Sequence, residues 1–551
     1  MTSTKISVKK LKDPIYGYIA IQKDFIEKVI DTAPYQRLRR IVQTSYAPVF
    51  ASAVHNRFVH SLGVYHLGRM AGETLKTEIV ARIETLGLEL DQKKLDDILE
   101  VFLLACLLHD VGHAPFSHTG EKFYAKPGRD VSELHKILKK LVGKPDFTAD
   151  MPKNGSEAAA PHEIVSAIVG IKEFRKMFKP ETEFFARCIT GYQYKKLSTE
   201  NSIRNCFIQM LNSKLIDVDK LDYLIRDAYI TGYESTKIDY PRLLGALTVI
   251  FKDGVFAVAY RKGAVSVIEN VVYAHDSERK WIQTHPVILY ENYLLNHIFK
   301  ALEKKLNTSE ARLFSPDALS AEGVKLKDAK NVRLLSDDDI IHLMKELYAE
   351  DQLVREYFHR DKRRHPVWKS EAEYRLLFEK RPGTNGEIFR KLQESLNAMV
   401  NYLDNTDNGI INNKLIDDLK EELKRLESQD GLDPETRARQ MDEKCSILKT
   451  VECLLGKKAG CGKEGCVLLK ADQFSSGFRK FAAVNSPFEI RIVLNDDKPD
   501  ESVSFNELVV SLDSRIKSNT DLFYLYSRVR RPAADISSAL IQNSAKAIAN
   551  G

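Results

Sequence analysis

Apolar residues recur at helical spacing over most of the chain up to about Phe299. The pattern starts in Phe25–Val42 and includes a fully apolar stretch, Val101–Leu108, which is typical of helices that bury one face or are buried entirely. The first segment, ISVKKLKDPIYGYIAI, instead predicts two short strands around a turn at Asp13-Pro14 and Gly17. This part of the chain is therefore predicted to be mainly helical, with a hairpin at its start.

Other segments depart from this helical pattern. VFAVAYRKGAVSVI predicts a second hairpin with its turn at Lys262-Gly263, and the polar stretch Gly143–Ala160 predicts a loop. Beyond Phe299 the chain is heavily charged and helical, and the run DDLKEELKRLESQD predicts an exposed helix face. Near the C-terminal end, FEIRIVL predicts a strand and DLFYLYSRVRR a helical stretch.

These patterns predict a mainly α-helical protein with small β-hairpins. A core region is expected at residues 1–305, followed by a charged helical region at 306–440 and a C-terminal α+β region at 441–551.

Length and composition are those of a globular protein. The 551 residues are 43% hydrophobic and 29% charged, which excludes a fully disordered chain. No apolar run is long enough to cross a bilayer, and the N-terminal MTSTKISVKK lacks an apolar signal core. With only seven cysteines, a cytoplasmic location and no membrane partner are expected. The net charge of +6 permits phosphate-bearing ligands without demanding nucleic acid.

The segment LLACLLHDVGHAPFSHTGE carries the most informative chemistry. An apolar helix delivers His109 and Asp110 at its C-terminal end, where Gly112 and Pro115 stop the helix. A buried imidazole and carboxylate are costly unless they have a partner, and a divalent cation is such a partner. Two satisfied polar groups at a helix end would be the simpler interpretation of this segment alone.

Two other predicted helices offer similar groups. Arg57 and His60 are three residues apart, hence on one helical face. Asp219, Tyr223 and Asp227 form a stripe at intervals of four, with Lys220 beside it. Three separate helices therefore each present a metal-type ligand, which favours a metal site.

The order H…HD…D resembles the HD-domain superfamily of metal-dependent phosphohydrolases. The wider context is similar to its deoxynucleoside triphosphate triphosphohydrolase branch, which includes the human SAM-and-HD-domain enzyme and bacterial dGTPases. The resemblance spans roughly residues 9–300. The motifs that carry it are DPIYG (13–17), IDTAPYQRLRRIVQ (30–43), HNRFVHSLGV (55–64), HDVGHAPFSHTGE (109–121), HE (162–163) and DVDKLDYLIRD (217–227).

The resemblance implies that His60, His109, Asp110 and Asp219 hold one divalent cation. The cation is expected to lower the pKa of a water and to neutralise charge at phosphorus. The donor set leaves Mn, Fe, Mg, Ni, Co and Zn open. The resemblance also allows Mg²⁺ to accompany the nucleotide phosphates.

Catalytic roles are implied for His113 and His162, one of which would protonate the leaving 5′-oxygen or orient the nucleophile. Glu121 matches an acidic residue that orients such a histidine. His118 matches a further pocket histidine, with a structural residue at a helix start as the alternative. His135 competes with His162 for the second position, and the His-Glu pair before an apolar helix favours His162.

Substrate contacts follow from the same resemblance. Arg57 and Lys220 are expected to meet phosphates. Gln43 and Asp227 would bind the sugar 3′-hydroxyl, and Tyr223 would pack on the sugar.

The chain also departs from the family pattern. Thr44 stands where members with strict deoxyribose selection have an apolar residue. His275, Arg279 and Gln283 occupy positions where a phosphate-binding Arg and a sugar-packing Tyr are usual. A ribonucleotide or modified nucleotide therefore stays open as substrate.

A second nucleotide site is implied for regulated members of the family. Asp31, Gln36 and Arg39 match positions that bind an activating guanine nucleotide, and packing or capping of their own helix is the equal alternative. The resemblance further implies a homo-oligomer, either a dimer or a tetramer.

Two features lie outside the resemblance. Cys445, Cys453, Cys461 and Cys466 could form a structural zinc site, but only one close-spaced pair is present, so scattered free thiols are favoured. The basic run HRDKRRHPVWK (359–369) could contact nucleic acid, and a solvated surface loop is favoured because one basic patch without interleaved aromatics is weak support.

The sequence thus predicts a metal-dependent phosphohydrolase that cleaves (deoxy)nucleoside triphosphates to nucleoside and inorganic triphosphate, with activation by a second nucleotide left open. One alternative is an HD nucleotidase or phosphodiesterase acting on another nucleotide or on nucleic acid. The other is a nucleotide-binding regulator with a vestigial site.

Overall fold

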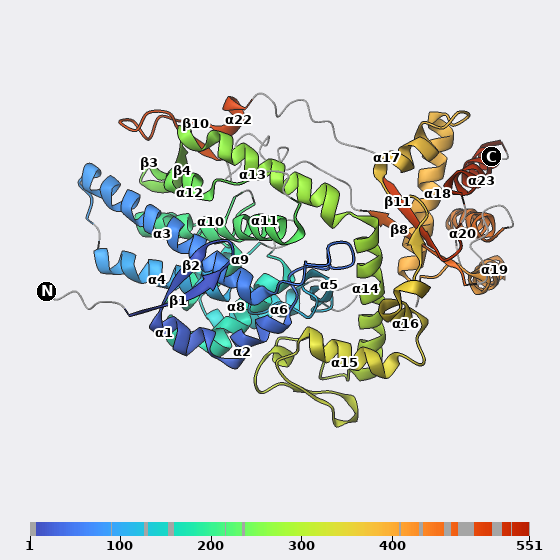
Figure 1. Ribbon diagram of the computed structural model, residues 1–551, viewed down its shortest axis with the longest axis horizontal. Helices are drawn as coiled ribbons and strands as arrows, with labels where there is room; N and C mark the ends of the chain where they lie inside the picture. Colours follow the sequence, from blue (N-terminus) through green and yellow to red (C-terminus); the bar gives the residue numbers. More distant parts are fainter. Residues whose placement is uncertain are drawn as a thin grey trace. The chain divides into compact units, whose positions relative to one another are not determined.

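The computed structural model describes twelve stretches of the chain (Figure 1): residues 7–89, 91–125, 131–152, 159–214, 216–233, 237–406, 409–428, 433–456, 464–471, 490–509, 521–530 and 532–549. They group into two compact units that interleave along the sequence. Unit 1 comprises Met1–Arg279, Ile298–Glu346 and Ser476–Ile516, and unit 2 comprises Lys280–His297, Leu347–Ser475 and Lys517–Gly551. The linear division at residues 305 and 440 stays a prediction.

The structure confirms a mainly helical fold with small sheets. Unit 1 holds most of the helices. They are α1 (Lys23–Phe25), α2 (Ala33–Gln36), α3 (Arg57–Leu86), α4 (Gln92–Leu108), α5 (His118–Glu121), α6 (Ser132–Val142), α7 (Pro145–Asp150), α8 (Pro161–Phe174), α9 (Thr182–Thr190), α10 (Thr199–Leu211), α11 (Val218–Thr231), α12 (Tyr240–Gly245), α13 (Val265–Glu278), α15 (Asp337–Leu347) and α22 (Phe505–Leu508). Helix α14 (Pro286–Leu306) begins in unit 2 and ends in unit 1. No helix among the described residues is long and apolar enough to span a membrane.

Helix α3 is the central element of unit 1. It packs against α4, α10 and α11 (Figure 1), and most of its first half is buried. Its start is fixed by the side chain of Asn56, which accepts a hydrogen bond from the N–H of Val59, a common N-cap arrangement. It ends at Gly87, which has the left-handed conformation favoured at helix C-termini. The N-terminal turn of α3 is thereby held against the ends of α4 and α11.

Two kinds of sheet accompany these helices in unit 1. Strands β1 (Val8–Asp13) and β2 (Gly17–Gln22) form the predicted N-terminal hairpin. Its turn is stabilised by the Asp13 carboxylate, which accepts hydrogen bonds from the N–H groups of Ile15 and Tyr16. A four-stranded sheet has the order β10-β9-β4-β3, and a small pair is formed by β5 and β6. The bounds are β3 (Leu247–Lys252), β4 (Val255–Arg261), β5 (Val324–Lys325), β6 (Asn331–Val332), β9 (Arg491–Val493) and β10 (Ser502–Ser504).

The predicted hairpin at Lys262-Gly263 is wrong. Those residues form a 3₁₀ turn, and the following VSVI begins α13. The hairpin lies one strand earlier, where β3 and β4 are joined by Asp253 and Gly254, both with positive φ. Asp-Gly is the strongest short signal for such a two-residue turn.

The helical spacing in Phe25–Val42 corresponds to a succession of short helical turns of α, π and 3₁₀ type. Two other expectations are corrected. Within Gly143–Ala160, predicted as a loop, Pro145–Asp150 forms α7. The predicted C-terminal helix in DLFYLYSRVRR is strand β11 (Leu522–Ser527), because its aromatic residues are buried in a sheet.

Unit 2 packs helices around a three-stranded sheet of order β7-β11-β8. Its core contains Trp368, Leu396, Val451 and Phe523. Besides β11, the elements are α16 (Gln352–Phe358), β7 (His365–Pro366), α17 (Glu371–Tyr374), α18 (Gly386–Asp404), α19 (Asn413–Ser428), α20 (Pro434–Leu455), β8 (Cys466–Ala471) and α23 (Ala533–Ala549). The 3.6-residue pattern of DDLKEELKRLESQD belongs to α19, which buries Leu415 and Leu419 and exposes most other side chains.

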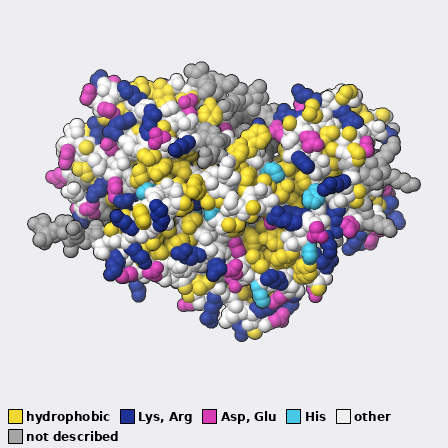
Figure 2. All heavy atoms as spheres, viewed as in Figure 1, with side chains coloured by type: hydrophobic (Ala, Val, Ile, Leu, Met, Phe, Trp, Pro, Cys, Tyr) yellow, Lys and Arg dark blue, Asp and Glu magenta, His cyan; other side chains and the backbone are white. Residues whose placement is uncertain are grey.

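The basic run at 359–369 is not a solvated loop throughout. Arg363 and Arg364 are buried, and they pair with Glu291 and Glu356 respectively. A buried guanidinium needs such a partner because its desolvation is costly. Across the face in Figure 2, basic and acidic side chains are interspersed, so the small net charge is not gathered in one region there.

The predicted cysteine cluster is described only in part. Cys445 and Cys453 lie on α20, and Cys466 is buried in β8. Cys461 lies outside the described residues. The interpretation of these four cysteines as scattered free thiols, rather than a zinc site, therefore stays a prediction.

Gly112, two residues after Asp110, lies where the fold leaves no room for a side chain. A Cβ built there would lie 2.2 Å from the backbone N of Ser166 on α8, and backbone cannot move aside as a flexible side chain does. We expect Gly112→Ala to lower the free energy of unfolding by about 3 kcal/mol, at the upper end of overpacking costs. Chemical denaturation with Gly245→Ala as control checks this, since nothing lies within 4 Å of a Cβ at Gly245. Equal stability of the two variants would contradict the close approach of this loop to α8.

Candidate active site

The three predicted ligand-bearing elements converge in unit 1. His60 lies in the first turn of α3, His109 and Asp110 follow the last turn of α4, and Asp219 lies in the first turn of α11. His60, His109 and Asp110 are buried, and the Asp219 side chain is 34% exposed. The group is therefore open to solvent only on the side of Asp219.

The ligand atoms of His60, His109 and Asp110 all lie within 4.8 Å of one another, and Oδ1 of Asp219 lies close to both imidazoles. Nε2 of His60 is 3.3 Å from Nε2 of His109 and 3.0 Å from Oδ1 of Asp219. Nε2 of His109 is 3.4 Å from Oδ1 of Asp110 and 3.6 Å from Oδ1 of Asp219. Ligands bound about 2.1 Å from one ion lie about 3.0 to 3.4 Å apart at octahedral or tetrahedral angles. The spacing of the donors therefore fits a single divalent cation.

The other imidazole nitrogens support this interpretation. Nδ1 of His60 is 2.7 Å from Oδ2 of Asp222, and Nδ1 of His109 is 2.9 Å from the carbonyl oxygen of Cys106. Both partners are acceptors, so each Nδ1 carries a proton and each Nε2 faces the other donors of the group. Without a proton on either Nε2, two lone pairs facing at 3.3 Å repel each other, and a cation between them relieves this repulsion. Imidazoles oriented in this way by a carboxylate or carbonyl are usual in metal sites.

Asp222 is a functional residue that sequence reasoning missed. It is fully buried, and besides His60 it accepts hydrogen bonds from Arg226 and from the hydroxyl of Tyr16, the latter at 2.8 Å. Arg226 is also paired with Asp13 at 3.0 Å, so the DPIYG motif is anchored behind the ligand group. The signal was present in DVDKLDY, where Asp222 lies three residues after Asp219 on the same helical face.

Arg57 contacts the ligand group directly. Its guanidinium is buried and donates hydrogen bonds to Oδ2 of Asp110 at 2.7 Å, to Oγ of Ser117 at 2.9 Å and to the carbonyl oxygen of Gln43. In the described structure its charge therefore faces the aspartate. The expected contact of Arg57 with phosphates stays a prediction.

These contacts set the pKa values of Asp110 and His60. Burial raises the pKa of Asp110, but Arg57, His109 and His113 outweigh it and hold this pKa well below its usual range. Burial likewise lowers the pKa of His60, yet its hydrogen bonds to Asp219 and Asp222 raise it to about 9. The site is thus a strongly negative pocket that attracts a proton or a cation.

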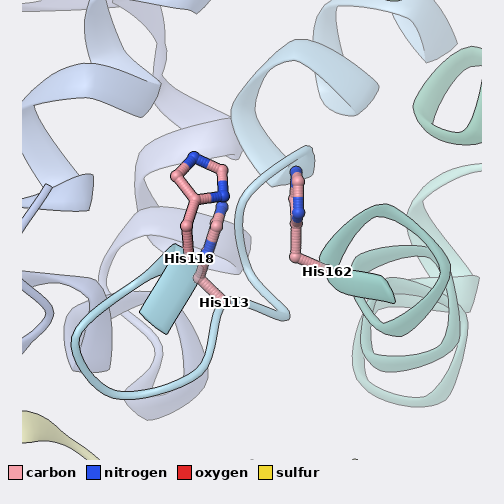
Figure 3. A group of neighbouring side chains, drawn as sticks. All are labelled: His113, His118 and His162. Atoms are coloured by element: carbon pink, nitrogen blue, oxygen red, sulfur yellow. The ribbon is translucent and has the colours of Figure 1, made fainter. Parts of the chain in front are cut away.

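A second group of side chains lies beside the first. His113 comes from the loop after α4, His118 from the start of α5, and His162 from the start of α8 (Figure 3). Glu121 binds two of them: its Oε2 accepts from Nδ1 of His162, and its Oε1 lies 3.0 Å from Nδ1 of His118. The structure thus brings together the four predicted residues of this group. His135 instead contacts the hydroxyl of Tyr192 at 2.9 Å.

The histidine group suits proton transfer better than metal binding. The rings of His113 and His162 are stacked, with centroids 4.2 Å apart and an angle of 18° between planes. Because imidazole lone pairs lie in the ring plane, two stacked rings cannot both point at one ion. His118 is largely exposed, with 64% of its side chain accessible, so it faces solvent at the edge of the group.

The two stacked histidines have opposite proton affinities. Burial lowers the pKa of His162, but the Glu121 carboxylate outweighs this and raises it to about 9. Burial and the nearby Arg57 both hold the pKa of His113 well below its usual value. At neutral pH, therefore, His162 is an imidazolium beside a neutral His113. Such divergent pairs are typical of acid–base sites.

The predicted substrate residues lie around these groups. Asp227 is buried on α11, and its Oδ1 is 2.7 Å from Nε2 of His55. Gln43 is buried next to His55, whose carbonyl oxygen accepts a hydrogen bond from the Gln43 N–H. Tyr223 is partly buried on α11. Lys220 donates to Asp217 at 2.6 Å and to the Ser213 carbonyl oxygen.

The remaining predicted residues are more scattered. Asp31 is exposed, while Gln36 and Arg39 are joined by a hydrogen bond of 2.9 Å, and the Arg39 guanidinium stacks 3.5 Å from the ring centre of Phe58. Oγ1 of Thr44 is buried without a hydrogen-bond partner among the described residues. His275 and Arg279 lie at the end of α13 in unit 1, and Gln283 belongs to unit 2.

Comparisons with known proteins agree with this geometry. Residues 57–224 match the HD domain family model, and this range contains all four predicted ligands. A relative from Mycoplasma pneumoniae described as "Uncharacterized protein MG461 homolog" is 29% identical over 47% of this chain and 52% of its own length. The deoxynucleoside triphosphate triphosphohydrolase SAMHD1 of Danio rerio is 32% identical over 43% of this chain and 36% of its own length.

A solved structure shares the fold. A hypothetical protein from Aquifex aeolicus superposes with a TM-score of 0.55 and 19% identity, covering 96% of this chain and all of that one. In sequence, however, the chain spans about half the length or less of the curated relatives reported above.

These findings relate residues 57–224 to the HD domain family, and within that range His60, His109 and Asp110 form a group that could hold a metal ion. Over 43% of its length the chain is also similar to the SAMHD1 triphosphohydrolase of Danio rerio, which confirms the resemblance seen in the sequence.

The contact between His60 and Asp222 gives a direct test of the metal site. Asp222→Asn removes the charge that fixes the His60 ring while leaving all four ligands in place, so we expect metal affinity to fall about 10- to 100-fold. Competitive titration with a metal-binding dye measures this. Asp24→Asn, at an exposed carboxylate paired with Lys28, is the control and should bind metal as the unmodified protein does. Unchanged affinity in Asp222→Asn would show that the ring is oriented by something else.

Proposed function

We propose that this protein is a metal-dependent triphosphohydrolase that cleaves (deoxy)nucleoside triphosphates to nucleoside and inorganic triphosphate. The observation that carries the proposal is the convergence of the His60, His109, Asp110 and Asp219 ligand atoms at 3.0 to 3.6 Å beside an acid–base pair of histidines. The similarity of 43% of the chain to the SAMHD1 protein of Danio rerio supports the choice of substrate class.

The four ligand residues would hold one divalent cation, with Mn, Fe, Mg, Ni, Co and Zn all compatible with two imidazoles and two carboxylates. Such a cation, when bound, polarises a phosphoryl oxygen and lowers the pKa of a water. Asp219 is the most accessible of the four side chains. We therefore place the substrate on that side, where Mg²⁺ could accompany its phosphates.

His162 is the residue suited to protonate the leaving 5′-oxygen. Its Nδ1 is fixed by Glu121, which leaves Nε2 as the proton donor toward substrate. As the bond between the α-phosphorus and the 5′-oxygen breaks, water adds to phosphorus and the His162 proton completes the nucleoside hydroxyl. Glu121 stabilises the imidazolium before transfer and orients the ring for reprotonation.

His113 has a different role because it is neutral and buried. Its Nε2 lies 3.2 Å from Oδ1 of Asp110, which places it between the ligand group and His162. The single N–H of this neutral imidazole faces Asp110, so its Nδ1 is an acceptor that can orient a water molecule without adding charge next to Arg57. His118, at the exposed edge, is placed to contact the outer phosphates.

The remaining contacts follow the family pattern. Lys220 and Arg57 would meet phosphates, Gln43 and Asp227 would bind the sugar, and Tyr223 would pack on it. The buried carboxylate of Asp227 and the unpartnered amide oxygen of Gln43 are acceptors that suit hydroxyl donors.

Regulation is also part of the proposal. Asp31, with Gln36 and Arg39 nearby, would form an activating nucleotide site in a homodimer or homotetramer. The Gln36–Arg39 hydrogen bond and the stacking of Arg39 on Phe58 hold the guanidinium in one orientation, which favours binding of a phosphate.

Product analysis tests the reaction class. We expect the protein with Mn²⁺ to release nucleoside and inorganic triphosphate from at least one nucleotide or nucleotide pair, resolved by HPLC across all dNTPs and NTPs. Asp110→Ala should lose bound metal and turnover together, whereas Asp96→Ala, at an exposed carboxylate, should keep both. Release of monophosphate or pyrophosphate would instead identify an HD nucleotidase or phosphodiesterase, and tight binding without turnover would identify a regulator.

The acid role of His162 gives a pH prediction. The protonated ring is required, so kcat should fall as the pH rises through about 9, where His162 loses its proton. His162→Gln should lower kcat about 10²- to 10⁴-fold, the usual contribution of a general acid, with metal content unchanged. His342→Gln, at an exposed histidine on α15, is the matched control. If kcat in His162→Gln stays within a few fold of the unmodified protein, another group is the acid.

A further inference from the structure

Asp337 links two segments of the active site that are distant from it in sequence. It is the first residue of α15 and is buried. Its Oδ2 accepts a hydrogen bond of 2.8 Å from the N–H of Val42, and its Oδ1 accepts one of 2.7 Å from the N–H of Phe116. One carboxylate therefore satisfies two backbone groups 295 and 221 residues away.

Both segments lead directly to the ligand group. Val42 precedes Gln43, and its carbonyl oxygen accepts a hydrogen bond from Oγ of Ser117. The same Oγ accepts a hydrogen bond of 2.9 Å from Nε of Arg57, whose Nη1 binds Asp110. A continuous series of hydrogen bonds thus runs from Asp337 through Ser117 and Arg57 to a metal ligand.

Arg37 ties the same region a second time. Its buried guanidinium donates to the carbonyl oxygens of Val111 at 2.7 Å and His113 at 3.0 Å, within the loop that follows the HD pair. Its other Nη donates to the carbonyl oxygen of Leu335, two residues before Asp337. Hydrogen bonds of Asp337 and of Arg37 therefore both hold the segment leading into α15 against the loop that follows Asp110.

The backbone of this loop is strained, and hydrogen bonds from its surroundings are needed to keep its conformation. Phe116 and Ser117 have φ values of 56° and 52°, in the left-handed region that residues with a Cβ rarely adopt. Conformations of this kind persist only where the surroundings fix them, and they are frequent at functional sites. Asp337 supplies one of these constraints at Phe116 itself.

Stabilisation of its own helix does not account for Asp337. A carboxylate in the first turn of a helix interacts favourably with the helix dipole, and Asp338 and Asp339 also occupy that turn. Asp339 already accepts hydrogen bonds from the N–H and hydroxyl of Ser336. The Asp337 oxygens are used on Val42 and Phe116 instead.

The charge state of Asp337 is set by these neighbours. Burial raises its pKa, while the two N–H groups and Arg37 lower it and Asp338 raises it, with a result of about 7. The ionised carboxylate accepts both hydrogen bonds, whereas the protonated form turns an O–H toward one of the two N–H donors. The link between the two segments is therefore complete above about pH 7 and weakened below it.

We propose that Asp337 is a positioning residue of the active site, holding the Val42–Gln43 segment and the Phe116–Ser117 loop together so that Arg57 and Asp110 keep their places. The kinetic part of this inference rests on the proposed function. It also means that the catalytic centre depends on a residue beyond the matched HD range, which ends at residue 224.

The test compares Asp337→Asn with Asp338→Asn in the full chain. Asn keeps the size of the side chain but places an NH₂ opposite one N–H donor. Asp338 is exposed and pairs only with Arg40 among the ion pairs of the described residues, at 3.3 Å, so its variant is the matched control. Hydrogen exchange, metal content and the pH dependence of kcat are measured for both variants and for the unmodified protein.

In Asp337→Asn, exchange of the Val42 and Phe116 amides should accelerate at least about tenfold, while metal stoichiometry is retained. Misplacing reacting groups by about 1 Å costs about 100-fold, so kcat should fall about 10- to 100-fold with a smaller change in KM. The rise of kcat through about pH 7 in the unmodified protein should disappear. Asp338→Asn should match the unmodified protein in hydrogen exchange, metal content and maximal kcat, with the rise of kcat moved only to lower pH because Asp338 raises the pKa of Asp337.

Unchanged exchange at both amides in Asp337→Asn would overturn the proposal, as would loss of metal together with activity, which indicates a structural role. If the unmodified protein hydrolyses no nucleoside triphosphate, the proposed function fails. The exchange measurement still decides the role of Asp337 in that case, because it needs no substrate.

Discussion

The arrangement of unit 1 depends on compensation of a buried negative charge at Asp110. This carboxylate lies at the end of an apolar helix, where an unpaired charge would be prohibitively costly. Arg57 neutralises it from one side at 2.7 Å, and His109 and His113 face it from the other at 3.4 and 3.2 Å. Because these partners come from α3 and from the loop after α4, satisfying one charge fixes how both elements meet.

The charges around Asp110 also separate the metal site from the proton donor His162. The carboxylates of the ligand group favour a bound cation, whereas the Glu121 carboxylate keeps a proton on His162. His113 lies between them and is kept neutral by Arg57 and by burial. A cation site and a proton donor can therefore operate a few ångströms apart without exchanging roles. The link from Asp337 to Ser117 keeps this spacing fixed from outside the HD range.

Much of the site could be predicted from the sequence, because HD and the aspartate-rich motif of α11 occupy helix ends with short-range signals. Helical spacing placed His60 on one face with Arg57 and Asp219 on one stripe with Tyr223, whereas the expectation that His60 and Asp219 meet came from the family resemblance. Asp222 was missed although its place on the helical face of Asp219 was a local signal, because its contact with His60 is tertiary. Asp337 was missed because no local pattern distinguishes it from an ordinary helix carboxylate. The misplaced hairpin had a local signal, Asp253-Gly254, but β11 was misassigned because its aromatic run fits a buried strand and a buried helix equally.

The central claim is that two imidazoles and two carboxylates bind one divalent cation. Pulsed electron paramagnetic resonance on the protein loaded with one equivalent of Mn²⁺ tests it most directly, because ¹⁴N nuclei coordinated to the ion give resolved couplings. The account predicts couplings from two nitrogens, those of His60 and His109, with one of them lost in His109→Ala if metal is supplied in excess. Mn²⁺ bound without nitrogen coupling, or couplings that persist when both histidines are replaced, would contradict it.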